Sequence, residues 1–222
     1  MSPRVGVALE LGTKRTFATA IEWPGWSRAG RDESAALDEL LVYGPRYAAV
    51  LRDRMRFAAP RSLDALEVVE RLPGNATTDF GAPGIPPAAD AEPVGARQLS
   101  RQSSILRACW SAFDAAAASA AGRSLRSGAR GGGRDLAKIR AHVLDAELAY
   151  LKSLSGNAPR GSGPEEVREA YVEALGARAR GELPDIGPRG GSRWSARYAV
   201  RRAAWHVLDH TWEIEDRVDD VG

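Results

Sequence analysis

A segment rich in proline and glycine, residues 73–95, divides the chain into two parts whose apolar residues recur with different periods. Before it, apolar residues alternate in short runs, as in strands, whereas after it they recur every three or four positions, as in helices. Proline and glycine interrupt both kinds of element. The sequence therefore predicts an α+β domain at residues 1–72, a linker at residues 73–95, free or strapped along that domain, and an all-α domain at residues 96–222.

The chain begins with the pattern of a β-hairpin. Val5–Leu11 alternates apolar side chains on one face, and Arg15–Trp23 follows after a three-residue turn at Gly12–Lys14. So short a connection favours antiparallel pairing. We therefore expect these two segments to be neighbouring strands of one sheet.

A helix and a third strand are expected after the hairpin. Apolar residues recur at helical spacing over residues 34–55, and either Asp32 or Ser34 can cap the start of this helix. Gly44–Pro45 is expected to break the helix in two, because proline cannot continue a helical hydrogen-bond pattern. Leu66–Leu72 is the candidate for the third strand.

Four amphipathic segments in the second part predict four helices, joined by connections that look short. Residues 164–181 begin with a proline, which is favoured at the first position of a helix. Short connections favour antiparallel neighbours, so we expect an antiparallel four-helix bundle. The expected helices are residues 96–121, 134–154, 164–181 and 192–218.

Composition excludes several classes of function. The formal net charge of +2, from 31 basic and 29 acidic residues, gives no electrostatic reason to expect nucleic acid as a partner. A single cysteine, Cys109, excludes an internal disulfide and a cysteine-rich zinc site. No segment has the ~20 consecutive apolar residues that a membrane span needs, and the N-terminus lacks the pattern of a signal peptide. We therefore expect a cytoplasmic protein with no membrane partner.

The chain has only three histidines, and all of them lie in predicted helices. His206 and His210 are four residues apart, so their imidazoles share a helix face, and His142 lies at the edge of the apolar face of another helix. Three imidazoles with an open fourth position are typical of a catalytic metal site, with zinc or nickel as candidates. The alternative is a set of core histidines that hydrogen bonds satisfy. Val207 stands where a zinc protease needs glutamate, which excludes that enzyme type.

Two carboxylates near the histidines are candidate catalytic residues. Glu213 lies one turn beyond His210 on the same face, and Asp209 directly precedes His210. Either could orient an imidazole or accept a proton. The alternative for Glu213 is a solvated carboxylate or a salt bridge with Arg217.

Glu147 falls in the middle of the apolar face of its predicted helix. A buried carboxylate needs a partner. We expect an ion pair with an arginine of the last helix, either Arg201 or Arg202, with a role as general base as the alternative. Glu147 lies ~140° from His142 on an ideal helix, so it is not expected to bind the same metal.

The histidine motifs resemble those of the DinB-like superfamily of four-helix bundles. His142-Val-Leu-Asp-Ala-Glu147 resembles its second-helix motif, and Arg202-Ala-Ala-Trp-His206-Val-Leu-Asp-His210 resembles its last-helix motif. The resemblance covers about residues 96–218 and implies that the three histidines bind a metal. The superfamily includes metal-dependent hydrolases of the YfiT type and transferases and isomerases that use mycothiol or bacillithiol.

The first domain resembles small HicB-like domains. The resemblance lies in Phe17-Ala-Thr-Ala-Ile-Glu-Trp23-Pro-Gly-Trp26, in Arg28-Ala-Gly30 and in the helix start at Glu33–Leu37. It implies a module for packing or for binding a partner, which could be a second copy of the chain in a homodimer.

Together these patterns predict a metal-dependent enzyme that acts on a small molecule. The open position of the metal could carry water, as in a hydrolase, or a low-molecular-weight thiolate such as mycothiol, as in a transferase. The alternative is a non-catalytic binding module, in which the helices are a scaffold or the metal is structural.

Overall fold

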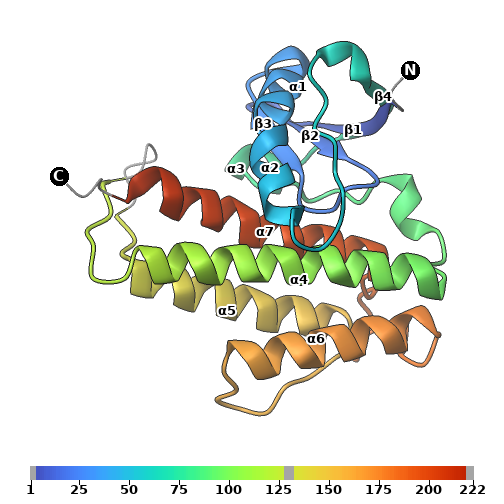
Figure 1. Ribbon diagram of the computed structural model, residues 1–222. Helices are drawn as coiled ribbons and strands as arrows, with labels where there is room; N and C mark the ends of the chain where they lie inside the picture. Colours follow the sequence, from blue (N-terminus) through green and yellow to red (C-terminus); the bar gives the residue numbers. More distant parts are fainter. Residues whose placement is uncertain (1–3, 128–132, 219–222) are drawn as a thin grey trace. The chain divides into compact units, whose positions relative to one another are not determined.

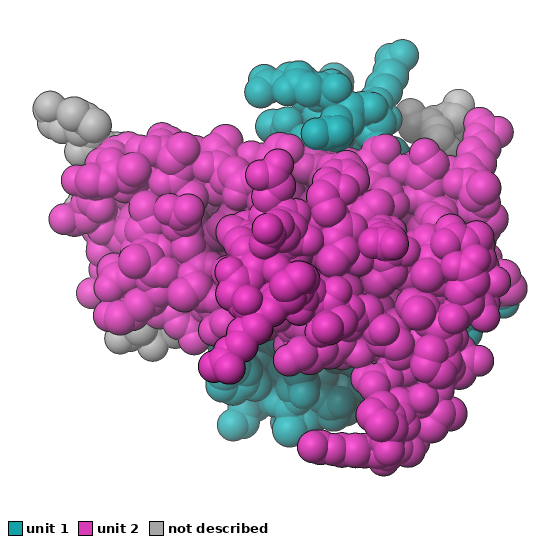
Figure 2. Space-filling model, turned by 90° about the horizontal axis from the view of Figure 1, so that it is seen from below, with its two compact units in different colours: residues 1–92 teal, residues 93–222 magenta. Residues whose placement is uncertain are grey.

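The computed structural model describes residues 4–127 and 133–218 and divides the chain into two compact units, Met1–Glu92 and Pro93–Gly222 (Figure 2). The architecture is mixed, because the first unit contains a β-sheet and the second contains long helices (Figure 1).

Unit 1 is built on a four-stranded sheet of order β3-β2-β1-β4. The predicted hairpin is confirmed: β1 (Val5–Leu11) pairs antiparallel with β2 (Thr16–Ala20). The third predicted strand is β4 (Leu66–Pro73), which pairs parallel with β1. The sequence analysis missed β3 (Ser27–Gly30), which pairs antiparallel with β2.

One helix packs on β2 and β3 of this sheet, a second helix follows it, and an aromatic cluster forms part of the core. The predicted helix is divided as expected into α1 (Glu33–Val42) and α2 (Gly44–Leu51), and Asp32 caps α1 by accepting a hydrogen bond from the Ala35 backbone N–H at 2.8 Å. Trp26 stacks on Tyr47 with ring centroids 5.9 Å apart. The indole N–H of Trp26 donates to the Leu40 carbonyl at 2.8 Å, so the buried aromatic core has its polar atom satisfied.

The segment that was expected to be a linker is instead part of unit 1 up to Glu92. It contains the short helix α3 (Ala76–Phe80) and is held by Glu10 of β1, a carboxylate that is almost fully buried. Glu10 accepts hydrogen bonds from the Thr78 hydroxyl and from the backbone N–H groups of Gly84 and Ile85, the latter two at 2.9 and 3.0 Å. Such bonds to a charged acceptor each contribute about 1.5–3 kcal/mol. They explain why a Pro- and Gly-rich segment is strapped along the sheet.

Unit 2 consists of long helices with bounds within a few residues of those expected from the sequence. Helix α7 packs against the other three, and α5 also packs against α6 (Figure 1). Small side chains, including Ala199 and Ala203, line much of α7 and allow neighbouring helices to approach closely. The helices are α4 (Ala96–Ser119), α5 (Leu136–Ser153), α6 (Pro164–Ala179) and α7 (Ala196–Arg217).

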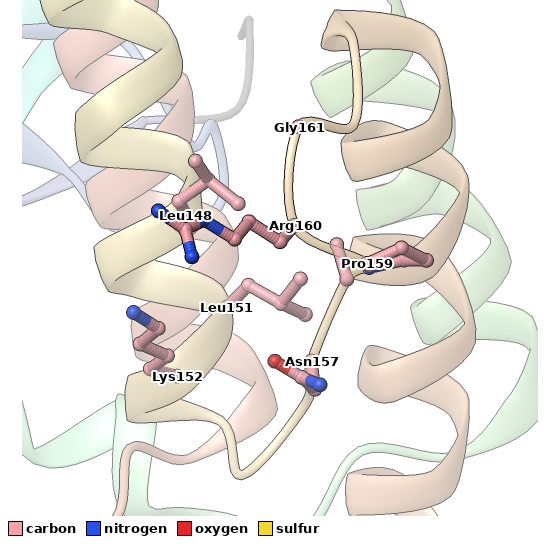
Figure 3. Close-up of a pocket in the computed structure, with 8 residues that line it drawn as sticks. Leu148, Leu151, Lys152, Asn157, Pro159, Arg160 and Gly161 are labelled. Carbon is pink, nitrogen blue, oxygen red and sulfur yellow. The ribbon is translucent and has the colours of Figure 1, made fainter.

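The directions of these helices differ from the simple antiparallel order that we expected. Helices α5 and α7 are antiparallel, because the Trp194 N–H, just before α7, donates to the carbonyl of Ser153 at the end of α5. Helices α5 and α6 run in the same direction, because Arg178 near the end of α6 donates to the carbonyl of Leu154, which follows α5. Residues 154–163 therefore run back along the helices before α6 begins (Figures 1 and 3).

Candidate metal centre

The antiparallel packing of α5 on α7 brings the three histidines together. His206 and His210 lie one turn apart on α7, and His142 faces them from α5. The Nε2 atoms of His206 and His142 are 3.2 Å apart, and one ring nitrogen from each of the three residues lies within 4.8 Å of the others. The cluster could therefore hold a metal ion.

The spacing and the protonation of the imidazoles both suit a metal. Two nitrogens that share a tetrahedral zinc ion at about 2.0–2.1 Å lie about 3.3 Å apart, close to the separation of His142 and His206. Burial, followed by the charge of His210, lowers the pKa of His142, and the same causes lower the pKa of His206 further. Both rings are therefore neutral at neutral pH, the form in which imidazole binds a metal.

His206 does not match the alternative of a core histidine satisfied by hydrogen bonds. It is only 7 % exposed, and its Nδ1 atom is buried without a hydrogen-bond partner among the described residues. Its other ring nitrogen, Nε2, lies 3.2 Å from Nε2 of His142. Buried polar atoms are normally paired, so the unpaired Nδ1 argues against a satisfied core histidine, and a shared metal ion would explain the close approach of Nε2 to another imidazole.

Glu213 and Arg217 orient His210 from the following turns of α7. The Glu213 carboxylate lies 2.7 Å from Nδ1 of His210, and this hydrogen bond is the largest cause of the lowered pKa of Glu213. An ionised carboxylate can only accept, so Nδ1 of His210 carries a proton, and in the neutral ring this tautomer leaves the lone pair on Nε2 for a metal. Arg217 donates to the other Glu213 oxygen, so the salt bridge raised as an alternative coexists with the contact to His210.

Arg217 is itself fixed by the connection between α4 and α5. Its Nε donates to the Arg126 carbonyl at 2.7 Å, and a terminal nitrogen donates to the Arg134 carbonyl at 2.9 Å. These bonds join backbone carbonyls, Arg217, Glu213 and His210 into one chain of contacts. The orientation of His210 is therefore set by the fold of this end of unit 2 and not by a free side chain.

Asp209, the other predicted carboxylate, lies on α7 directly before His210 and is half-buried. Glu213 accepts a hydrogen bond from Nδ1 of His210. The two candidate carboxylates occupy different positions around α7, and the contact of Glu213 ties it directly to the cluster.

Tyr150 and Arg202 also lie beside the histidines, and the sequence analysis did not assign them to the site. The Tyr150 ring centroid is 5.7 Å from that of His206, and the Arg202 guanidinium carbon is 5.8 Å from the centroid of the Tyr150 ring. Tyr150 lies eight residues after His142, and Arg202 lies four residues before His206. That helical spacing was the signal that could have identified them.

Glu147 is only 1 % exposed, as the sequence predicted, but its expected partner was wrong. Its Oε1 atom lies 3.4 Å from Nε of Arg168 on α6, and not beside Arg201 or Arg202 of α7. Arg168 also pairs with Asp114 of α4 at 2.7 Å. The reason is the direction of α6, which runs alongside α5 and brings Arg168 next to Glu147.

Glu147 is expected to make the stability of the protein depend on pH. Desolvation by burial raises its pKa from 4.5 to about 7, against the opposing charge of Arg168. A raised carboxyl pKa means that the folded state binds the proton more tightly, so stability falls as pH rises from about 4.5 to 7. The loss amounts to as much as about 3 kcal/mol. Melting temperatures of wild type and Glu147→Gln, measured between pH 5 and 8, should diverge as pH rises; a constant difference would contradict this assignment.

A separate cavity of about 420 Å³ lies between α5 and the segment that leads to α6 (Figure 3). Leu148 and Leu151 of α5 form its apolar wall, and Lys152 and Arg160 are its two cationic lining residues. In Figure 3 the Arg160 side chain extends from the loop towards α5 beside Leu148. The histidines do not line this cavity, which arises because residues 154–163 run back along α5.

Comparison with family models, with curated proteins and with solved structures finds no match for this chain. None of the helices in residues 4–127 and 133–218 has the length and hydropathy needed to cross a membrane. Cys109 is fully buried, and burial raises the pKa of its thiol, which makes it a poor nucleophile. The histidine cluster is therefore the feature of this chain that points to a function.

Proposed function

We propose that this chain is a metal-dependent enzyme of the DinB-like type, in which residues 93–222 form a four-helix bundle around one divalent ion, zinc or nickel. His142, His206 and His210 would hold the ion. The observation that carries the proposal is the convergence of three imidazole nitrogens within 4.8 Å, two of them on rings whose pKa values are lowered.

Accessibility of the cluster favours a catalytic site over a closed structural one. His206 and His210 are buried, whereas His142 is half-buried, so one side of the cluster lies near the surface. Three protein ligands also leave a coordination position for water or substrate. A bound ion would supply Lewis acidity, which lowers the pKa of a water molecule or a thiol.

The side chains around the cluster have separate proposed tasks. Glu213 orients His210 and keeps its proton on Nδ1, and Arg217 holds Glu213 in place. Asp209 is proposed as a second carboxylate that can accept a proton. The substrate is a small molecule, and the reaction is either hydrolysis or transfer to a low-molecular-weight thiol such as mycothiol. The HicB-like unit 1 is proposed to bind a partner, which could be a second copy of the chain.

Elemental analysis of the purified protein, before and after incubation with zinc, tests the proposal. We expect about one metal ion per chain, and none in a variant with alanine at all three histidines. The metal-loaded protein should then be screened for ester or amide hydrolysis and for thiol transfer. An occupied site without turnover would indicate a structural metal, and no metal under any condition would leave a binding module as the function.

A further inference from the structure

The cavity between α5 and the segment that leads to α6 is separate from the histidines, and the proposed metal chemistry leaves it unused. Its volume of about 420 Å³ lies within the range of pockets that bind small molecules, about 300–1,000 Å³. One wall is a face of α5, and the other wall is the loop of residues 157–161 (Figure 3). A ligand in this cavity would therefore lie between a helix and a loop.

The loop that encloses the cavity is held at both of its ends. The Gly156 N–H donates to the Leu151 carbonyl at 2.9 Å. Glycine is required there, because a Cβ atom would lie 2.3 Å from Cδ1 of Leu151 and 2.7 Å from Cβ of Ala174 on α6. At the other end the N–H of the buried Ser162 donates to the Pro159 carbonyl at 3.2 Å. The cavity is therefore built by a fixed course of the backbone.

The inner surface of the cavity is mainly apolar. Leu151 is buried and Leu148 is half-buried, and in Figure 3 the Leu151 side chain points from α5 towards the loop. Ala158 and Pro159 add apolar surface from the loop. Covering such a surface removes it from water, which favours a ligand with an apolar body.

Lys152 and Arg160 add two positive charges to this apolar surface. Both side chains are exposed, and neither forms an ion pair or a side-chain hydrogen bond with another residue in the described part of the chain. None of the eight lining residues is acidic. Charge complementarity therefore favours a ligand that carries an anionic group.

The carboxylates that are closest along the chain have other interactions or lie at a distance. Glu147 is buried and pairs with Arg168. Glu165 and Glu166 lie in the first turn of α6, where the helix dipole stabilises a negative charge. Asp145 lies two turns of α5 before the cavity lysine, about 10 Å along the helix axis. The positive charge of the cavity is therefore left for a ligand.

We propose that this cavity binds a small organic monoanion with an apolar body, of the class of medium-chain aliphatic carboxylates. The two N–H groups of the Arg160 guanidinium fit one carboxylate, and the Lys152 ammonium adds a point charge. The aliphatic chain covers Leu148 and Leu151. This inference goes beyond the proposed function, because it requires no metal at the histidines.

Isothermal titration calorimetry on the full chain tests the site with acetate, butanoate, hexanoate, octanoate and neutral 1-octanol. Two metal-free proteins are used, the chelator-treated wild type and the variant with alanine at all three histidines, so that no carboxylate can bind to an ion. Affinity should rise about fourfold for each methylene that the cavity buries. Octanoate should bind at least fivefold more tightly than 1-octanol, and equally well to both proteins.

Arg160→Gln and Lys152→Gln should each weaken octanoate binding about threefold to fivefold, the range for an exposed ion pair, and leave 1-octanol binding unchanged. Arg140→Gln is the matched control, because Arg140 is an exposed cation of α5 outside the cavity. Circular dichroism verifies the fold of each variant.

Equal affinities for octanoate and 1-octanol would overturn the site, as would an equal loss of octanoate binding in Arg140→Gln. Octanoate binding that is lost in the folded triple-histidine variant would place the anion at the histidines and would also overturn it. Absence of a metal from the histidines would overturn the proposed function alone, because the titrations use metal-free protein.

Discussion

Replacing His206 with alanine is expected to abolish zinc binding at micromolar zinc. The three imidazoles are almost equidistant, with ring centroids 4.7 Å apart for His206 and His210, 5.0 Å for His206 and His142, and 4.9 Å for His142 and His210. Removal of His206 leaves two imidazoles on different helices, and two ligands rarely hold zinc in proteins. Competition with a colorimetric zinc chelator measures the dissociation constant in wild type and variant.

Glu213 should give a graded effect in the same assay, because it acts through His210. Loss of the partner of a metal-bound histidine typically lowers metal affinity 10–100-fold. We expect about tenfold for Glu213→Gln, since the amide oxygen can still accept from Nδ1, and up to about a hundredfold for Glu213→Ala. Glu215→Gln, an exposed carboxylate two residues further along α7, is the control. An unchanged dissociation constant in Glu213→Ala would show that His210 needs no partner.

Replacing Arg178 with alanine is expected to destabilise the protein by about 3 kcal/mol, since it removes a largely buried side chain that donates to three backbone carbonyls. The Arg178 side chain is 7 % exposed and donates to the carbonyls of Leu154, Leu183 and Pro184 at 2.9–3.2 Å. It thereby joins the end of α6 to both connections at this end of the helices. Urea unfolding followed by circular dichroism measures the change.

Arg180 is the matched control for this prediction. It lies two residues further along and pairs with Glu182 at 2.7 Å, but its side chain is 61 % exposed. Solvent screens such a pair, so Arg180→Ala should change stability far less than Arg178→Ala. Similar losses in both variants would mean that Arg178 stabilises the protein through its charge and not through its hydrogen bonds to backbone carbonyls.

Much of the metal centre could be predicted from the sequence, because helical periodicity fixes which side chains share a face. The four-residue spacing of His206 and His210 needs nothing but a helix, and the convergence with His142 needs only that α5 and α7 pack together. Tyr150 and Arg202 were missed because an aromatic residue and an arginine are common in ordinary packing and carry no distinctive spacing of their own. Their relation to the histidines becomes evident only when both stripes are followed along the antiparallel pair.

The direction of α6 could not be predicted from loop length alone. The connection of residues 154–163 seemed short enough for a reversal. Ten extended residues nevertheless span about 33 Å, whereas a helix the length of α6 spans about 24 Å. A connection of this length therefore permits α6 to run either parallel or antiparallel to α5. The direction of α6 determines which of its side chains lies beside Glu147.

The β3 strand and the packing of residues 74–92 on unit 1 were missed for different physical reasons. Ser27–Gly30 has four residues and contains no large apolar side chain that could reveal an alternating pattern. It is a strand because it pairs with β2. The proline and glycine content of a segment shows where helices and strands end, but it does not show which acceptors the backbone N–H groups of that segment bind. The segment that follows β4 is held by Glu10. The position of this carboxylate in a strand of apolar residues is explained by the hydrogen bonds that it accepts from the backbone N–H groups of Gly84 and Ile85.

The division of the three candidate ligands between two helices would have a thermodynamic consequence for the whole of unit 2. Two of the nitrogens lie on one rigid element, α7. The free-energy cost of bringing the three imidazoles together is therefore almost entirely the cost of docking α5, whose histidine is 64 residues from His206 in sequence. Ion affinity and the free energy of α5 docking are then linked quantities, and a change in one appears in the other. A substitution that loosens α5 far from any histidine would therefore weaken metal binding, and an ion in the cell would act as a reversible crosslink that holds the last helix to the second.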